Sequence, residues 1–206
     1  MTIGGEPYVL KHFDLATDWL LRASGDAGCR AVALWELGLY AAMPACIDHT
    51  VVGAARGDGR TAALLMRDVS PWLVPEGDSV VDLATHHRFL DHMAEQHAAF
   101  WGWRDDAGML PMATRYQILT PEMAALELAR GGTDFIPGAV AEGWRRLDDL
   151  SDLAPVARRL VRDPEPLGAA RAATPATFLQ GDWKFGNRGA GPDGRTILLD
   201  WDRPGE

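Results

Sequence analysis

The stretch Gln180-Gly-Asp-Trp-Lys-Phe-Gly-Asn187, followed by Asp200-Trp-Asp202, decides the interpretation of this sequence. Two short β-rich runs, residues 177–179 and 196–200, flank the first stretch and lead into the second. The turn sequence Gly191-Pro-Asp-Gly194 lies between the two runs, which is typical of an antiparallel pair. The sequence therefore predicts a late β-hairpin whose loop and end hold carboxylate and amide side chains.

The side chains of this hairpin suit phosphoryl transfer. Asp182 and Asn187 fit the Asp-x-x-x-x-Asn spacing of a kinase catalytic loop, and Asp200 ends the following strand. One carboxylate, Asp182, would accept or orient the attacking hydroxyl. The oxygens of Asn187 and Asp200 would hold Mg²⁺, a hard cation that prefers such ligands. Lys184 is close enough in sequence to Asp182 to reach the transferring phosphoryl group.

Residues 178–206 resemble the catalytic loop and metal-binding motif of the aminoglycoside phosphotransferase-like small-molecule kinases. The pattern of that family is His-Gly-Asp-x-x-x-x-Asn followed by Asp-Trp-Asp or Asp-Trp-Glu. The resemblance implies an α+β, protein-kinase-like fold of two lobes, with ATP and Mg²⁺ as cofactors. It also implies transfer of the γ-phosphate to a hydroxyl of a small molecule, such as an aminoglycoside-, choline- or sugar-like acceptor. Gln180 replaces the histidine of the family, which usually supports the loop by hydrogen bonding, as glutamine also can.

The resemblance implies a nucleotide site in the first third of the chain. Lys11, within a β-rich run, corresponds to the lysine that anchors the nucleotide phosphates, and Glu36 on the next long helix is its expected ion-pair partner. The segment from Met66 to Val69 resembles the hinge that meets adenine through its backbone. Without the motif, Lys11 would be a solvent-facing strand residue and Glu36 an exposed or otherwise paired one.

Local patterns predict an order of elements that agrees with this resemblance. A strand is expected at residues 8–13, and an antiparallel hairpin at 50–55 and 61–67, across an Asp-Gly turn. Apolar periodicity and capping residues predict helices over residues 15–22, 26–42 (or 28–42), 80–103, 121–129 and 139–161. Pro155 can divide the last of these helices in two.

These elements predict three segments: a β-rich nucleotide lobe over residues 1–69, a hinge or linker over 70–79, and a mostly helical lobe over 80–206 that carries the catalytic loop and metal hairpin. Measured against the family, an opening hairpin with a phosphate-covering loop should precede Lys11, and further helices should follow Asp202. The sequence is therefore expected to be incomplete at both ends.

Composition narrows the classes of partner. The chain has 206 residues, a formal net charge of −9, 47% hydrophobic and 24% charged residues. An acidic balance argues against nucleic acid or phospholipid as a general partner, and the composition is that of a globular protein. Two cysteines exclude a disulfide framework, and no apolar stretch is long enough to span a membrane. We expect a soluble cytoplasmic protein, with no oligomeric state predicted.

Two other interpretations stay open. The chain can be a non-catalytic nucleotide-binding remnant of the same fold, which the short segment before Lys11 and the replacement at Gln180 favour. It can also be a histidine-dependent metalloprotein, but His86, His87, His92 and His97 lack the i, i+4 spacing that places two ligands on one helical face. Asp182 and Asn187, taken alone, would be ordinary solvated turn residues.

Overall fold

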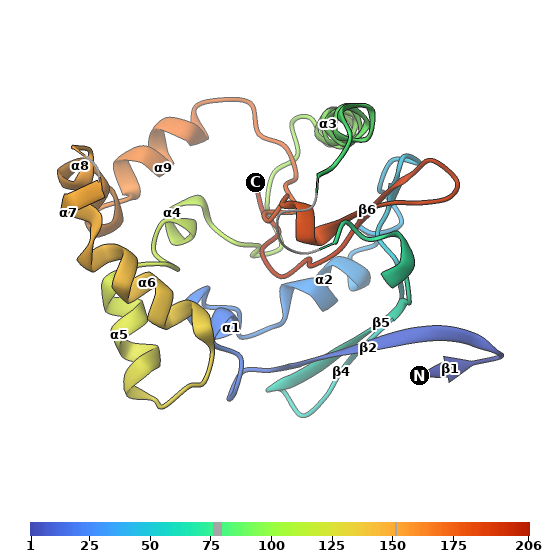
Figure 1. The fold of residues 1–206 in the computed structure, drawn as a ribbon, viewed down its shortest axis with the longest axis horizontal. Helices are drawn as coiled ribbons and strands as arrows, with labels where there is room; N and C mark the ends of the chain where they lie inside the picture. The colour runs from blue at the N-terminus through green and yellow to red at the C-terminus, as the bar shows by residue number, and fades with distance from the viewer. Residues whose placement is uncertain (76–79, 151) are drawn as a thin grey trace. The chain divides into compact units, whose positions relative to one another are not determined.

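The computed structural model describes residues 1–75, 80–150 and 152–206, and the side chain of Leu150 is not described. The fold is α+β, as expected from the sequence (Figure 1). The chain forms two compact units. Unit 1 comprises residues 1–13, 28–109 and 176–206, and unit 2 comprises residues 14–27 and 110–175. Unit 1 thus contains both the N-terminal strands and the late hairpin. The predicted lobes at 1–69 and 80–206 stay a prediction, and residues 76–79 of the predicted linker lie outside the described residues.

The larger sheet belongs to unit 1 and has the strand order β1-β2-β5-β4. Its strands are β1 (Thr2–Ile3), β2 (Glu6–Asp14), β4 (Val51–Arg56) and β5 (Thr61–Arg67). The predicted β4–β5 hairpin is confirmed, and the two strands pair antiparallel with Val51 opposite Met66. The strand at 8–13 is also confirmed, as part of β2. The two-residue β1 was not predicted, since a strand so short carries no periodic signal.

A second sheet has the order β3-β7-β6 and contains the late hairpin. Its strands are β3 (Ile47–Asp48), β6 (Arg188–Ala190) and β7 (Thr196–Leu198). Strands β6 and β7 are antiparallel, whereas β3 pairs parallel with β7.

The strand that pairs with β7 in the hairpin is β6. The prediction that residues 177–179 form this strand is therefore wrong. The turn is closed by a hydrogen bond from the Gly191 amide to the Arg195 carbonyl, which aligns the residues immediately beside the turn. Leu179 instead forms an isolated bridge with Gly205. Strand β7 ends at Leu198, before the predicted end at Asp200.

Three helical elements complete unit 1: α2 (Arg30–Glu36), η1 (Ser70–Trp72) and α3 (Leu83–Ala99). Helix α2 is shorter than the predicted 26–42, because Cys29 and Gly38 adopt left-handed conformations, with φ of 53° and 71°. Helix α3 begins at the N-cap Asp82, whose carboxylate accepts from the Thr85 amide. The predicted helix at 80–103 is therefore confirmed in its central part.

The core of unit 1 is built around the aromatic residue of the Asp-Trp-Asp motif. Trp201 is buried, and its indole N–H donates to the Leu198 carbonyl at 3.0 Å. Its ring stacks on Phe178 at a centroid distance of 6.4 Å and meets the edge of Tyr40 at 5.5 Å. A buried ring of this size anchors its chain neighbours, so the positions of Asp200 and Asp202 are tied to the core.

Unit 2 is helical. Its helices are α1 (Trp19–Ala23), α4 (Met112–Arg115), α5 (Pro121–Ala129), α6 (Phe135–Arg145), α7 (Leu147–Leu150), α8 (Ala154–Arg162) and α9 (Glu165–Ala172). Helix α5 has the predicted bounds, because Thr120 caps its first turn and Pro121 occupies the first helical position.

Two of the helices predicted in unit 2 are wrong in extent. The segment 139–161 forms parts of three helices rather than one, and Pro155 stands in the first turn of α8 rather than dividing a longer helix. Helix α1 is shorter than the helix predicted at residues 15–22. The Asp18 carboxylate accepts from the amides of Leu20 and Leu21, so Asp18 caps the helix and α1 begins at Trp19.

Candidate functional site

A buried glutamine joins the loop at residues 180–187 to the segment after β7. The Gln180 side chain donates to the carbonyls of Leu199 and Asp200, at 2.9 and 2.6 Å, and accepts from the Asp182 amide at 2.7 Å. Gln180 is only 2% exposed, so each of these bonds satisfies a group that water does not reach. Glutamine therefore makes supporting hydrogen bonds in the loop, as expected for this replacement of histidine.

The carboxylate of Asp182 is held by several groups. Asn187 Nδ2 donates to its Oδ2 and to its backbone carbonyl, both at 3.0 Å. The guanidinium of Arg203 lies 2.6 Å from the same Oδ2, and the ammonium of Lys184 lies 3.1 Å away. The structure thus brings Asp182, Lys184 and Asn187 together, and the short helical turn η2 (Phe185–Asn187) returns Asn187 to Asp182.

Lys11 lies against both aspartates of the Asp-Trp-Asp motif. Its Nζ is 2.7 Å from Oδ1 of Asp200 and 2.8 Å from Oδ2 of Asp202. Strand β2 supplies the lysine, and the segment anchored by Trp201 supplies the two carboxylates. The three side chains form a charged cluster, which we call the Lys11 cluster.

Burial and charge shift the titration of the Lys11 cluster in different directions. Burial, and then the neighbouring Asp200, raise the pKa of Asp202 to about 7, against the opposing charge of Lys11. Burial is the largest single influence on Asp200 and opposes its ionisation, but the charge and hydrogen bond of Lys11, the hydrogen bond with Asp202 and the charge of Lys184 together hold the pKa of Asp200 below its usual value. Burial works against the charge on Lys11, but the two carboxylates raise its pKa overall. The cluster thus keeps Asp200 ionised beside a charged lysine.

The backbone at Asp200 is left-handed. Its φ is 59°, a conformation in which aspartate is tolerated but uncommon. This turn ends the extended run of β7 and directs the chain from Leu198 towards the buried Trp201. Asp200 itself is therefore the strained residue after the end of β7, and such strain is often found at functional sites.

Glu36 is not the partner of Lys11, and the predicted ion pair between them is wrong. Glu36 is exposed at the last residue of α2, and its two carboxylate oxygens accept from Nε and Nη2 of Arg56 on β4, at 2.8 and 2.7 Å. The pKa of Glu36 is lowered by these hydrogen bonds. Because α2 ends at Glu36, the carboxylate projects from a helix terminus that packs near β4, and Arg56 reaches it there.

The predicted adenine hinge lies at the end of β5. Met66 is the penultimate residue of that strand and is half-buried, and Val69 is buried. The Val69 carbonyl accepts from the Trp72 amide at 3.0 Å and so starts the turn η1. Binding of adenine by this segment stays a prediction.

The oxygen atoms of Asn187 and Asp200 can be compared with the ligands that Mg²⁺ requires. Among the described residues, no group of three histidine, cysteine, aspartate or glutamate side chains is arranged to hold a metal ion. Mg²⁺ in nucleotide sites usually needs fewer protein ligands, because phosphate oxygens and water supply the others. Both hydrogen bonds of the Asn187 amide to Asp182 use Nδ2, which leaves Oδ1 as an oxygen donor. Asn187 and Asp200 therefore each offer the type of oxygen ligand that Mg²⁺ prefers, and binding of the cation by the two residues stays a prediction.

Sequence reasoning missed two charged residues of this site. Asp202 was quoted within the motif but given no role, and Arg203 was not singled out. Asp202 is 8% exposed, although a carboxylate is rarely buried without a partner. The sequence did contain a signal for Asp202. Asp200 and Asp202 flank Trp201, a residue expected in the core, so both carboxylates should lie on the same side of the chain.

Two histidines of α3 contact the second sheet and the loop at residues 180–187. His92 Nδ1 lies 2.8 Å from the Thr196 hydroxyl, and the His86 ring lies 5.7 Å from the Phe185 ring. Burial lowers the pKa of His97, whose backbone carbonyl accepts from the Thr177 hydroxyl. These contacts are those of packing residues.

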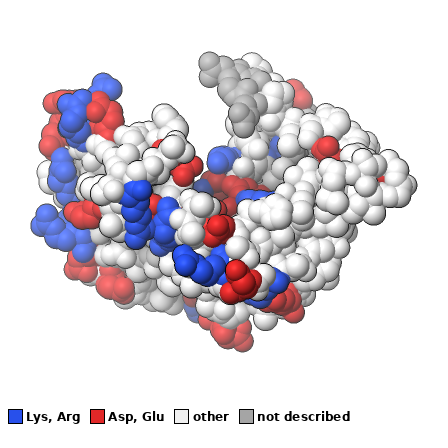
Figure 2. Space-filling model, turned by 90° about the horizontal axis from the view of Figure 1, so that it is seen from below, with Lys and Arg blue, Asp and Glu red and all other residues white. Residues whose placement is uncertain are grey.

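No protein-family model matches the chain, and a search of curated proteins found no match. Within the described part of the chain, no helix has both the length and the apolar character needed to cross a membrane. On the face drawn in Figure 2, acidic and basic side chains are interspersed, so that face carries no continuous basic patch.

Proposed function

We propose that the protein is an ATP-dependent phosphotransferase that acts on a hydroxyl group of a small molecule, with a protein-kinase-like two-lobe fold. One observation carries the proposal: Lys11 on β2 lies 2.7 Å from Asp200, a residue 189 positions later, within the same compact unit as the Asp182–Asn187 pair. Phosphoryl transfer needs this combination of a phosphate-binding cation, oxygen ligands for Mg²⁺ and a carboxylate facing the nucleophile.

Each residue has a role in this proposal. Lys11 binds the nucleotide phosphates, and its attraction to Asp200 keeps it beside the metal ligands. Asn187 Oδ1 and the Asp200 carboxylate would hold Mg²⁺, and the chemistry that the ion would supply there is neutralisation of phosphate charge. Lys184 approaches the transferring phosphoryl group, since its exposed side chain already reaches the catalytic carboxylate.

Asp182 orients the acceptor hydroxyl and takes its proton. Its described contacts with Asn187, Lys184 and Arg203 converge on Oδ2 and on the backbone. Among the described residues, Oδ1 makes no such contact and can accept the hydroxyl. Arg203 and Asn187 therefore act as positioning residues that set the orientation of the carboxylate.

The test is a single-turnover assay with γ-labelled ATP, Mg²⁺ and a panel of alcohols that includes aminoglycosides, choline and sugars. Label should move to an acceptor with the unaltered chain, and Asp182→Asn should reduce the rate by about 10²–10⁴-fold. Asp193→Asn is the matched control, because Asp193 is an exposed aspartate of the neighbouring turn. Equal rates for the two variants would contradict the role of Asp182.

A non-catalytic nucleotide-binding protein is the second candidate. The observation in its favour is that the cationic groups near the site are already engaged, Lys11 by two aspartates and Arg203 by Asp182. Calorimetric titration with MgATP separates the candidates. Binding of ATP without transfer to any acceptor would support the second one and exclude the first.

A further inference from the structure

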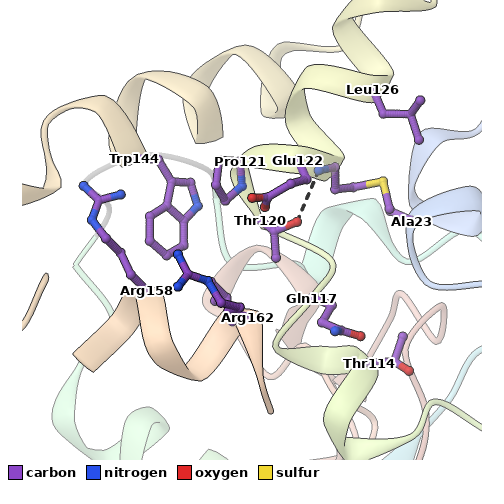
Figure 3. A pocket seen from close by; sticks show the side chains of 12 residues that line it. Ala23, Thr114, Gln117, Thr120, Pro121, Glu122, Leu126, Trp144, Arg158 and Arg162 are labelled. Carbon is purple, nitrogen blue, oxygen red and sulfur yellow. Dashed lines mark hydrogen bonds between the residues drawn. The ribbon is translucent and has the colours of Figure 1, made fainter. Parts of the chain in front are cut away.

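Unit 2 contains a cavity of about 540 Å³ that shares no residue with the proposed phosphotransfer site (Figure 3). Residues of α4, α5, α6 and α8, together with Ala23 of α1, line it. Its volume is within the range of sites that bind small organic molecules. The cavity is therefore large enough to be considered as a binding site in its own right.

Two arginines of α8 give the cavity a surplus of positive charge. Arg158 and Arg162 line it and lie beside the Trp144 ring in Figure 3. Arg158 pairs with Asp148 at 2.8 Å, but that carboxylate is 69% exposed, so the pair contributes little and can be exchanged for a ligand. Within residues 1–75, 80–150 and 152–206, no carboxylate forms an ion pair with Arg162.

The start of α5 also borders the cavity, but its first turn is capped by its own chain. Thr120 caps this nine-residue helix by accepting from the Met123 amide at 3.2 Å, and Pro121 stands in its first turn. Pro121 has no N–H and the Met123 amide already donates to Thr120, so the first turn of α5 offers an anion at most the Glu122 amide. Glu122 is the one acidic residue in the lining, against two guanidinium groups.

The remaining lining is largely apolar. Met123, Leu126 and Val161 line the cavity, and the Trp144 indole N–H is already donated to the Leu119 carbonyl at 2.7 Å. The Arg158 guanidinium lies over the Trp144 ring, 5.9 Å from its centroid, so a carboxylate bound by Arg158 comes close to an apolar ring surface. The lining of this cavity therefore suits a ligand that has both an anionic group and an apolar part.

We propose that this cavity binds a small organic carboxylate with an aromatic body. The carboxylate pairs with Arg162 and Arg158, a charge-assisted interaction, and the aromatic body packs on Trp144 and the aliphatic side chains. The proposal is independent of the phosphotransfer function, because it uses only residues of unit 2.

The test compares 1-naphthylacetate with its neutral amide, 1-naphthylacetamide, by calorimetric titration of the full chain. We expect the acid to bind about tenfold more tightly than the amide, a difference of about 1.4 kcal/mol. Arg162→Gln should remove that preference and leave the amide affinity unchanged. Arg159→Gln is the matched control, because Arg159 belongs to the same helix but does not line the cavity.

Arg158→Gln provides a second variant if Arg162→Gln does not fold, and it should also weaken binding of the acid. The indole N–H resonance of Trp144, assigned by its loss in Trp144→Phe, should shift when the acid binds. Three outcomes would overturn the proposal: no binding of the acid, equal affinity for acid and amide, or an equal effect of Arg159→Gln and Arg162→Gln.

Discussion

Lys11 Nζ lies 2.7 Å from Oδ1 of Asp200, and this ion pair ties strand β2 to the segment that follows β7. Asp202 is the second carboxylate on the same ammonium, at 2.8 Å. Phosphates and Mg²⁺ would have to enter between opposite charges that already attract each other. The Lys11 cluster is therefore both a structural contact of unit 1 and the centre of the proposed site.

Loss of the Lys11 ammonium should destabilise the unliganded protein. Lys11→Met leaves Asp200 and Asp202 facing each other without a counter-charge. Removing one partner of a buried ion pair costs about 3–5 kcal/mol, and the partial exposure of Lys11 reduces the expected loss to about 1–2 kcal/mol. Urea denaturation at pH 7 measures it. Lys184→Met, a change at an exposed lysine, should alter stability by less than about 0.5 kcal/mol. Equal stability of the two variants would show that the Lys11 cluster contributes nothing to the fold.

Gln180 should be needed for the stability of the catalytic loop. Gln180→Ala leaves the Asp182 amide and the carbonyls of Leu199 and Asp200 without their partner, at an expected cost of about 1–3 kcal/mol. Gln180→His, which introduces the residue of the resembled family, should recover part of this loss because imidazole also bonds to the backbone. Thermal denaturation of the three proteins gives the order. An alanine variant as stable as the histidine variant would contradict the bridging role.

The two proposed metal ligands should differ in their effect on nucleotide binding. Asp200→Asn keeps a side chain that tolerates the left-handed backbone but removes the charge, so MgATP affinity should fall further than in Asn187→Ala. Calorimetric titration at several Mg²⁺ concentrations measures both the affinity and its dependence on the metal. Asp193→Asn serves again as the control. An Asp200→Asn protein with unchanged Mg²⁺ dependence would remove Asp200 from the site.

Unit 2 should lose stability in acid through Glu127. This glutamate is buried, and hydrogen bonds from Arg22, and then the charges of Arg22 and Arg130, lower its pKa. A carboxyl whose pKa is lower in the folded state stabilises the fold at pH values above its unfolded pKa of about 4.3, and the benefit is lost as the pH falls below it.

Glu127→Gln should therefore be about 3 kcal/mol less stable than the unaltered chain at pH 7, with a difference that shrinks below about pH 4. Urea denaturation across this pH range checks the slope. Glu142→Gln removes an exposed ion pair with Arg145 and should change stability by about 0.5 kcal/mol or less. A difference for Glu127→Gln that stayed constant with pH would contradict this account.

Where the interactions are local, the sequence predicted the structure well. The β4–β5 hairpin follows from two apolar runs around an Asp-Gly turn, and α5 follows from a proline at its first helical position. In both cases the residues that set the geometry are sequence neighbours, so the pattern contains the information. The contact between Asp182 and Asn187 is local in the same sense, because both residues lie within one loop and the structure brings them together.

Contacts between distant segments were decided only by tertiary structure. Strand β3 has two residues and no periodicity, and it exists because β7, far along the chain, pairs with it. Glu36 pairs with Arg56 rather than Lys11, since the ends of α2 and β4 meet in the fold. Lys11 reaches both Asp200 and Asp202 because burial of Trp201 directs the two carboxylates to one ammonium. Sequence spacing carries turn and helix geometry, but the partner of a charged side chain depends on which elements the buried core brings together.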